Sequence, residues 1–579
     1  MDGIVTASLS SEININESHS DSSDHWYPNE MDFESDSDDC SASDGSDYDP
    51  DDDHQKGRGA NSTLNRQQQG PRQKKDKRKS LGEFVWAIVS MNHLLQLFKW
   101  CPECGSKNTI VGSCVMGLCV KIQYRCSNRK TPHSGTWTSS PVSHKRYLIN
   151  ILFTSTLNLC GIGYTAIQAV MAAMKMPFLH KSRFISITKT WFNPVVYNFF
   201  IPIRDAAISQ LKTRDTKILS GDGQFDSPGH CAKFCVYTIM DHTTGLIIDF
   251  FIAQKGLNFE ELERAGCREL LKKIIAKGVS QLKFVTDRHS GIRAMIRDDI
   301  SFSTVTHYFD IWHLAKSIGK ILKELTKLKR NESLIPWKQS IINHFWFSCR
   351  NSAGDPQTLI QTFHSFLLHI SNSHKWTTGT FSKMRGENLF PNFSQVVKCA
   401  HGKLQKIQLR RGAWIDRKSE TFSELFDKMT NKQLSEDIMH CSEFLHTGSI
   451  ENYHNVRLKY LPKRIAFSRE TTAIRSMIAI IETNRNIPTT ASSLQEPKMY
   501  VRYSKASAKW ILRKESKKKD YTYRGEILSK IEAHFFNGTF EFADMTEYVP
   551  KNTPKNIATI PKPSKEEMVK KYEARKRFE

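Results

Sequence analysis

The sequence lacks the features of a secreted, disulfide-stabilised protein. Its N-terminus has no basic segment followed by an apolar stretch, so no signal peptide is predicted. The 13 cysteines are an odd number, and five of them fall between residues 101 and 126, which does not fit a framework of disulfide pairs. We therefore expect an intracellular protein whose thiols are reduced.

Lysine and arginine are absent from the first 55 positions, which hold 17 Asp and Glu. All 83 Lys and Arg lie beyond position 55, whereas the whole chain of 579 residues carries 60 acidic residues and a formal charge of +23. The chain beyond position 55 therefore carries a much larger positive charge than the formal charge of the whole chain suggests. Such an excess favours a polyanionic partner, nucleic acid before a membrane surface. The other interpretation is a soluble basic protein without such a partner.

Charged residues are also absent from Tyr147–Met174, a stretch long enough to span a bilayer. This stretch nevertheless contains several Asn, Ser and Thr residues and a break at Gly161-Ile162-Gly163. We expect two buried helices here, and no membrane partner.

Residues 1–80 are rich first in Ser and Asp and then in Gly, Gln and Asn. They have too little apolar surface to fold, so we expect a disordered acidic leader. The leader ends in a basic cluster at residues 72–79, which is typical of nuclear import or contact with nucleic acid. We expect localisation in the nucleus, although a solvated run of charge would look the same.

A zinc ribbon is predicted over residues 81–145. Two pairs of soft or borderline ligands flank a strand-like hairpin, Thr109–Tyr124, that would bring the pairs together. With all four positions filled, such a site is structural rather than catalytic. Cys114 and Cys119 remain alternative ligands, and a cluster of buried free cysteines is the plainer interpretation. The predicted ligands of the structural Zn²⁺ are Cys101, Cys104, Cys126 and His133.

The pattern changes from helical to strand-like near residue 216. Residues 146–210 are predicted to be helical, with a glycine-containing turn. This segment could be a helix-turn-helix DNA-binding motif or a helical spacer. Beyond them, amphipathic helices are expected at Asn258–Ala276 and Gly291–Arg297. The expected strands are Thr216–Gly221, Phe234–Asp241, Leu246–Ala253, Leu282–Thr286 and Thr304–Phe309.

Three meandering strands, a helix and then strands alternating with helices form the order of a ribonuclease-H-like core. The predicted fold class is thus mixed α/β, with a five-stranded sheet and a large helical insertion. The core would take residues 211–310 and 440–485, and the insertion residues 311–439. Residues 486–579 are expected to be a basic C-terminal tail.

Three acidic residues stand where a two-metal site needs them. Asp222 and Asp287 each end an apolar run, and Glu451 lies in the first turn of a late helix. Cleavage of a phosphodiester needs an activated water or hydroxyl and relief of charge on the phosphate. Two Mg²⁺ (or Mn²⁺) ions supply both and prefer carboxylate oxygens. Asp222 and Asp287 are expected side by side, because the first and fourth strands of such a sheet are neighbours.

Each acid has a plainer alternative. Asp222 is a turn residue if Asp226 holds the metal instead. Asp287 could simply cap the helix that follows it. Glu451 could be a first-turn acid that complements the helix dipole and binds no metal, in which case Glu443 would be the ligand in its place.

Three segments carry a recognisable set of motifs: Gly221–His230, Ala232–Phe234 and His446–Arg464. They resemble eukaryotic cut-and-paste DDE transposases, closest to the Kolobok type and near the Mutator type. The resemblance includes an Asp-x-x-His arrangement at the end of the fifth strand, here Asp310 and His313, and a long helical insertion before the glutamate. It covers roughly residues 100–485.

The resemblance implies a DNA transposase that cleaves at transposon ends and joins the freed 3′-hydroxyls to target DNA. It implies that Asp222, Asp287 and Glu451 hold the catalytic metals, with Asp310 and His313 as accessory residues. It further implies double-stranded DNA as partner and a homo-oligomer. One departure is that Kolobok-type proteins often carry an amino-terminal THAP zinc domain, whereas residues 1–80 contain a single cysteine. Either recognition of the ends falls to the ribbon and adjoining helices, or the reading frame is truncated.

Basic residues follow the glutamate, and we expect them to contact DNA phosphates unless they are an ordinary solvated face. They are Arg457, Lys459, Lys463 and Arg464. The alternative function is a transposase-derived DNA-binding protein without catalytic activity. A proofreading-type exonuclease would require Asp-x-Glu on the first strand, which Asp222-Gly223-Gln224 lacks.

Overall fold

A computed structural model describes the protein over residues 86–228, 231–256, 261–377, 395–402, 414–487, 498–504, 509–514, 518–538, 544–554, 558 and 561–576. The predicted acidic leader, residues 1–80, and its basic cluster lie outside the described residues. The chain divides into two compact units, one with the described residues up to Pro141 and the other with most of the chain from Val142 onward. No helix in the described part is long and apolar enough to cross a membrane.

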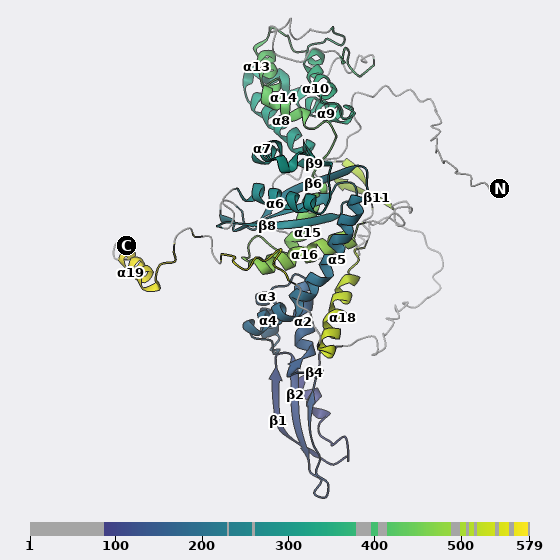
Figure 1. The fold of residues 1–579 in the computed structure, drawn as a ribbon. Helices are drawn as coiled ribbons and strands as arrows, with labels where there is room; N and C mark the ends of the chain where they lie inside the picture. Colours follow the sequence, from purple (N-terminus) through teal and green to yellow (C-terminus); the bar gives the residue numbers. More distant parts are fainter. Residues whose placement is uncertain are drawn as a thin grey trace, which may run out of the picture. The chain divides into compact units, whose positions relative to one another are not determined.

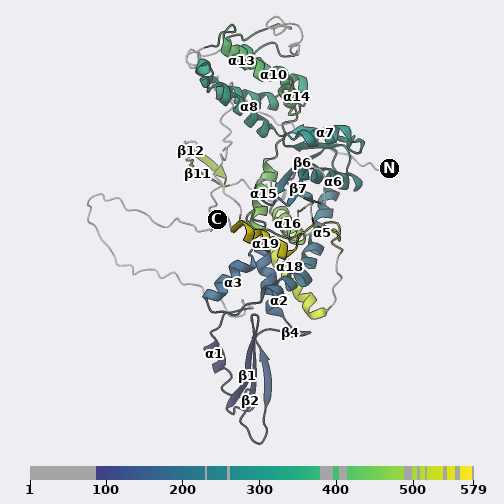
Figure 2. The same cartoon turned by 90° about the vertical axis from the view of Figure 1, so that its left-hand side faces the viewer.

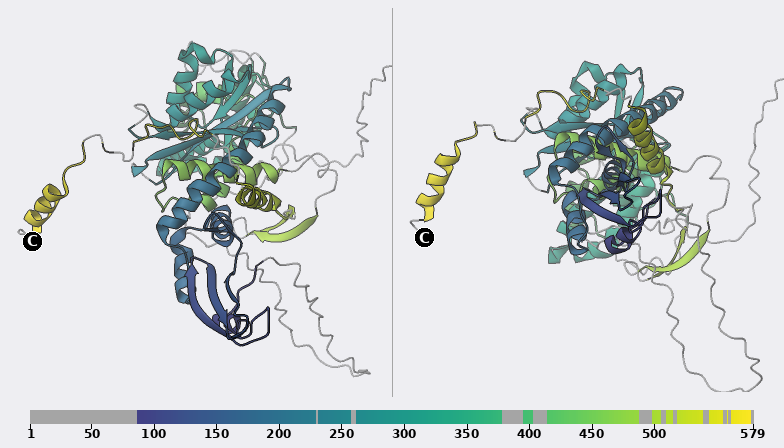
Figure 3. Two further views of the ribbon diagram at one scale, coloured as in Figure 1. Left: turned by 60° about the horizontal axis from the view of Figure 1, so that its bottom comes forward. Right: turned by 90° about the horizontal axis from the view of Figure 1, so that it is seen from below.

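The small unit is built on a three-stranded antiparallel sheet in the order β1-β2-β3 (Figure 3). β1 (Asn108–Met116) and β2 (Cys119–Cys126) form the hairpin that the sequence predicted, and β3 (Ser134–Thr138) pairs with β2. Gly117, in the turn between β1 and β2, has a φ of 68°, which glycine adopts without strain. A short helix, α1 (Met91–Gln96), precedes the sheet.

The large unit contains the predicted five-stranded sheet, with its strands in the order β10-β9-β6-β7-β8 (Figure 1). β7 is antiparallel to both β6 and β8, whereas β9 is parallel to β6 and β10 is parallel to β9. The sheet is therefore mixed, and the predicted adjacency of its first and fourth strands is confirmed. The strands are β6 (Lys217–Phe225), β7 (Phe234–Asp241), β8 (Ile247–Gln254), β9 (Leu282–Thr286) and β10 (Val305–Phe309).

Asp222 lies inside β6 rather than after its end, which corrects the predicted strand boundary at Gly221. The parallel pairing of β6 with β9 stops at Ser220, but the antiparallel pairing with β7 continues to Phe225. Asp222 consequently pairs with Thr238 of β7 at a point where β9 has already ended.

Helices cover both faces of this sheet (Figures 1 and 2). Along β7, Phe234 and Val236 pack with α5, α15 and α16, whereas Tyr237 and Ile239 on the other face pack with α6. All eight residues of β7 are buried for this reason, and the strand is almost continuously apolar. The covering helices are α5 (Asn193–Lys212), α6 (Leu262–Ala276), α15 (Gly448–Tyr460) and α16 (Arg469–Arg485).

The helices predicted between residues 146 and 210 are present, but they are not all buried. α2 contributes to the core that contains α16, whereas Met171 is the one buried residue of α3. The prediction of two buried helices is therefore wrong for α3, whose apolar character comes largely from four alanines. α3 carries no Lys or Arg, and a helix-turn-helix role stays a prediction. The elements are β4 (Val142–Ser143), β5 (Arg146–Tyr147), α2 (Leu148–Leu159), α3 (Tyr164–Ala173), α4 (Lys181–Ile187) and the π-helix η2 (Thr188–Phe192).

Between β10 and α15 the described residues are predominantly helical, as predicted for the insertion at 311–439. These helices share an apolar core distinct from those that flank the sheet (Figure 2). They are α8 (Ile311–Leu325), the 3-10 helix η5 (Lys329–Trp337), α9 (Lys338–Arg350), α10 (Pro356–Ile370), α13 (Glu420–Met429) and α14 (Lys432–Met439). A separate helix, α7 (Ser290–Asp298), connects β9 to β10.

The C-terminal segment, expected to be a basic tail, contributes to the core instead. α18 (Thr522–Asn537) buries an apolar stripe beside α2 and α5, and Tyr548 stacks on Phe250 of β8 with ring centroids 4.8 Å apart. The stripe repeats every four residues, close to the helical period of about 3.6, but abundant flanking lysines obscure it in the sequence. Its residues are Tyr523, Ile527, Ile531 and Phe535. The remaining elements are β11 (Met499–Ser504), β12 (Lys509–Lys514) and α19 (Lys565–Lys576).

Candidate functional site

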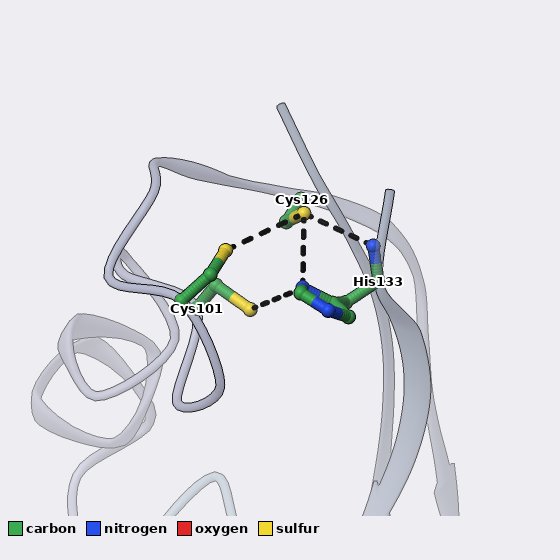
Figure 4. Close-up of side chains that lie close together, drawn as sticks. Cys101, Cys126 and His133 are labelled. Carbon is green, nitrogen blue, oxygen red and sulfur yellow. Dashed lines mark hydrogen bonds between the residues drawn. The ribbon is translucent and has the colours of Figure 1, made fainter. Parts of the chain in front are cut away.

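The ribbon brings its four predicted metal ligands together. Figure 4 shows Cys101, Cys126 and His133 of this group side by side. His133 Nδ1 lies 3.7 Å from the sulfurs of both Cys101 and Cys126, and the sulfurs of Cys104 and Cys126 are 4.0 Å apart. These separations approach the edges of a tetrahedron around zinc, about 3.5–3.8 Å for bonds of about 2.0–2.3 Å. The Glu103 carboxylate lies 3.5 Å from His133 Nε2. A carboxylate in this position orients a histidine whose other ring nitrogen binds a metal. The group can therefore hold a metal ion.

Cys114 and Cys119, the alternative ligands, stay outside this group. Cys114 is exposed on β1, and Cys119 begins β2 at the opposite end from Cys126. The four residues that come together are thus the four that the spacing of the ligand pairs predicted.

A second group of ligands forms where two parallel strands end at one edge of the sheet. Asp287 follows β9, Asp310 follows β10, and His313 lies in the first turn of α8. His313 Nδ1 is 2.6 Å from Asp310 Oδ2 and 3.1 Å from Asp287 Oδ1. These three residues can also hold a metal ion together.

Asp310 is buried and fixes the orientation of His313. It caps α8 by accepting from the Trp312 amide at 2.8 Å, and it accepts a second hydrogen bond from Thr447 at 2.6 Å. Burial by itself would raise the pKa of Asp310, but the hydrogen bonds from His313 and Thr447 outweigh burial and lower it. The ionised Asp310 in turn keeps a proton on His313 Nδ1. The other ring nitrogen, Nε2, lies 3.9 Å from Glu451 Oε1.

Asp222 approaches the same group from β6, together with two residues of α15. His454 Nδ1 lies 3.2 Å from Asp222 Oδ2, and Glu451 precedes His454 by one helical turn. The sequence analysis missed His454, although the i, i+3 spacing from Glu451 places both on one helix face. His454 is buried, and its Nε2 has no hydrogen-bond partner among the described residues.

The carboxylates of this cluster repel one another. Burial, followed by the charge of Asp222, raises the pKa of Asp287 to about 7. Burial and the charges of Asp222 and Asp287 likewise raise the pKa of Glu263 to about 8. Burial raises the pKa of Glu451, with a further contribution from Asp222. The site therefore favours a bound cation.

Glu263 was also missed, because only packing brings it near the cluster. A Cβ at residue 223 would lie 2.8 Å from Glu263 Cγ, so glycine is what allows α6 to approach β6 here. A Cβ at residue 221 would lie 2.5 Å from the ring of Phe284. The two glycines that flank Asp222 are thus explained by close approach rather than by a turn.

This electrostatic arrangement makes a prediction about pH. Asp287 and Glu263 bind protons more tightly in the folded state than in the unfolded state, where their pKa values are about 3.9 and about 4.3. Without metal, their contribution to the free energy of unfolding should fall as pH rises from about 4 to about 8. Added Mn²⁺ competes with those protons, so it should raise the melting temperature more above about pH 8 than below about pH 6. Thermal melts with and without Mn²⁺ measure this difference, and a larger metal effect at the lower pH would contradict it.

The two alternative acids are engaged elsewhere. Asp226 Oδ1 accepts from the Lys233 amide at 2.9 Å, which closes the loop between β6 and β7. Glu443 pairs with Lys283 at 2.7 Å. Asp222, rather than either of these two carboxylates, is among the main causes of the raised pKa of Asp287.

A basic cleft of about 350 Å³ opens beside Asp287 and His313. Its other lining side chains are Arg288, Lys316, Ser317 and Lys320. Lys316 and Lys320 are exposed one turn apart on α8, so both project on one side of that helix. The cleft thus combines cations that suit phosphate oxygens with acids that suit metal ions. The sequence analysis did not single out these lysines.

The predicted DNA contact at Arg457 is wrong, because this side chain is buried. Arg457 donates to Gln224 of β6 and to Ser476 of α16, linking three elements of the core. It follows Glu451 and His454 at the same helical spacing, which places it on the inner face of α15. Lys459 lies 3.2 Å from the buried Glu482. Lys463 and Arg464 are exposed, as phosphate contacts must be.

A matched pair of variants separates these roles. Arg457→Met should lower the free energy of unfolding by about 1–3 kcal/mol, because Gln224 is left buried without its donor. Lys463→Ala combined with Arg464→Ala should leave stability unchanged and weaken DNA binding. The slope of log affinity against log salt should then fall by up to about 2. Thermal melts and fluorescence anisotropy at several salt concentrations test both, and an undiminished salt slope in the double variant would contradict the assignment.

No family model matches the chain, and neither does any curated protein. Function must therefore be argued from the site itself.

Proposed function

We propose that this protein is a DDE-type DNA transposase that cleaves phosphodiester bonds at transposon ends and joins the 3′-hydroxyl ends to target DNA. The observation that carries the proposal is the gathering of carboxylates from distant segments beside a basic cleft. Asp222 comes from β6, Asp287 from the end of β9 and Glu451 from α15. Their mutual effect on pKa values supports a shared site.

The order of the strands supports a ribonuclease-H-like core. If the five strands are numbered by their order in the chain, they lie across the sheet in the order 5-4-1-2-3. The second strand is antiparallel to both of its neighbours. Such a core places an acid on the first strand next to an acid after the fourth, as Asp222 and Asp287 are here. The helical segment between β10 and α15 corresponds to the insertion that precedes the glutamate.

The donors of the site fit a hard divalent cation. Asp222, Asp287 and Glu451 would hold Mg²⁺ or Mn²⁺ through carboxylate oxygens. When bound, two such ions activate the attacking water or hydroxyl and stabilise the leaving oxygen. In the ribbon, three thiolates and an imidazole favour structural Zn²⁺ instead.

The side chains of the protein bind and orient the DNA. Lys316 and Lys320 hold phosphates at the mouth of the cleft, next to Asp287 and His313. Asp310 holds His313 with Nε2 directed toward Glu451, where this nitrogen can take or return a proton. Double-stranded DNA is the partner, a homo-oligomer bridges two ends, and the nucleus is the compartment.

Nicking of supercoiled plasmid DNA by the full chain tests the proposal. We expect nicked circles with Mg²⁺ or Mn²⁺, and none with EDTA or with Ca²⁺ alone, because Ca²⁺ binds carboxylates with a looser geometry. Binding of DNA without any metal-dependent nicking would overturn the enzyme assignment in favour of a transposase-derived DNA-binding protein.

A further inference from the structure

The helical insertion contains a second group of soft metal ligands, which the sequence analysis did not identify. His369 lies in the last turn of α10, His374 follows it, and Cys399 and His401 lie on the segment 395–402. One ligand atom of each residue lies within 4.8 Å of those of the other three. We propose that these four side chains bind a structural zinc ion, a site that does not depend on DNA cleavage.

The distances agree with a tetrahedral site. Cys399 Sγ lies 3.5 Å from His369 Nδ1 and 3.7 Å from His374 Nδ1, and His401 Nε2 lies 3.2 Å from His369 Nδ1. For zinc bonds of about 2.3 Å to sulfur and about 2.05 Å to nitrogen, a tetrahedron has S–N edges of about 3.5 Å and N–N edges of about 3.3 Å.

The three imidazole rings surround a common point. Each pair of ring centroids among His369, His374 and His401 is 5.0 Å apart, with interplanar angles of 77°, 81° and 82°. Equal separations with nearly perpendicular planes are the arrangement of three ligands around one ion. Trp337 and Trp414 pack against these rings at 5.6–5.8 Å and form part of an apolar wall.

Hydrogen bonds outside the group direct two of the histidines inward. His401 Nδ1 lies 2.7 Å from the Gly402 carbonyl oxygen, and His374 Nε2 lies 3.2 Å from Asn372 Oδ1. When these nitrogens donate outward, the lone pairs of His401 Nε2 and His374 Nδ1 face the other ligands. Such outer partners set the tautomer of a ligating histidine.

The backbone holds the ligands in register. Lys375 and Lys398 form an antiparallel bridge, and the Cys399 amide donates to the His374 carbonyl at 3.0 Å. This pairing sets His374 opposite Cys399. A zinc ion would then tie both short segments to the C-terminal end of α10, where Trp376 and Cys399 already belong to the core of the insertion.

The composition of the group favours a closed zinc site. One thiolate and three imidazoles are borderline-soft donors, which suit zinc rather than Mg²⁺. Four protein ligands leave no position for a substrate, so the ion would stabilise structure.

Zinc content of the purified full chain tests the proposal. We expect two zinc ions per chain, one of which is lost in His401→Ala and one in the ribbon variant Cys101→Ser/Cys104→Ser. His401→Cys supplies another zinc ligand and should keep both ions. His364→Gln changes a buried histidine of the same core outside the group and should also keep both.

Two results would overturn the site: no loss of zinc in His401→Ala, or a ribbon variant that holds no zinc. The ribbon variant leaves the insertion intact, so it decides the matter even if His401→Ala fails to fold. Loaded with Co²⁺, this variant should show the visible d–d bands of a tetrahedral site and the charge-transfer band of a single thiolate. Spectra of octahedral Co²⁺ would count against the proposal.

Discussion

Asp287→Asn should lower metal-dependent nicking of plasmid DNA by more than about 100-fold. Loss of an outer partner of a metal ligand alone costs about 10–100-fold, and Asp287 is placed to be a direct ligand. The amide keeps the shape of the side chain but removes the charge that the metal needs. It also removes a carboxylate that burial and Asp222 disfavour, so metal-free stability should not fall. Initial rates of nicking and thermal melts measure the two effects.

Asp226→Asn is the matched control for this experiment. Asp226 lies only four residues from Asp222, but its carboxylate accepts from the Lys233 backbone. We expect it to retain nicking within a few-fold of the wild type. Wild-type nicking by Asp287→Asn, or loss of nicking in Asp226→Asn but not in Asp222→Asn, would show that other acids bind the metal.

Removing the ribbon cysteines should unfold the small unit. Structural zinc contributes on the order of 10 kcal/mol to such modules, and the described part of the ribbon consists of α1 and a single three-stranded sheet. Cys101→Ser/Cys104→Ser should therefore abolish the protection of amides in β1–β3 from hydrogen exchange. The amides of β7, buried in the sheet of the other unit, should stay protected.

Cys114→Ser provides the control, since Cys114 is exposed and lies outside the metal group. It should retain both the zinc and the protection of β1–β3. If the double serine variant lost zinc but kept slow exchange throughout β1–β3, the ribbon would not depend on its metal.

Local patterns in the sequence predicted much of the framework. The bounds of β7 and β9 agree with the runs predicted at Phe234–Asp241 and Leu282–Thr286, because a buried strand leaves a largely apolar segment in the sequence. The four ribbon ligands were also found, since each pair lies close in sequence and a hairpin joins them. Both predictions rest on interactions between near neighbours in the chain.

Residues that depend on tertiary packing were not predicted. Glu263 reaches the acidic cluster because α6 packs against Gly223, and no local pattern encodes that approach. The ligands of the insertion form two pairs in the sequence, His369 with His374 and Cys399 with His401. Only the fold of the insertion brings the two pairs together. Arg457 looks like a surface cation in sequence, yet it bonds to Gln224 in the core. Charge alone did not reveal its burial.

The most direct test of the shared metal site is the position of Mn²⁺ in crystals of the full chain soaked with that ion. Anomalous scattering locates Mn²⁺ independently of any assumption about the ligands. We expect an anomalous peak in contact with the carboxylates of both Asp222 and Asp287, with Glu451 close by. A peak held by Asp226 or Glu443 instead, or no peak within reach of Asp287, would contradict the account.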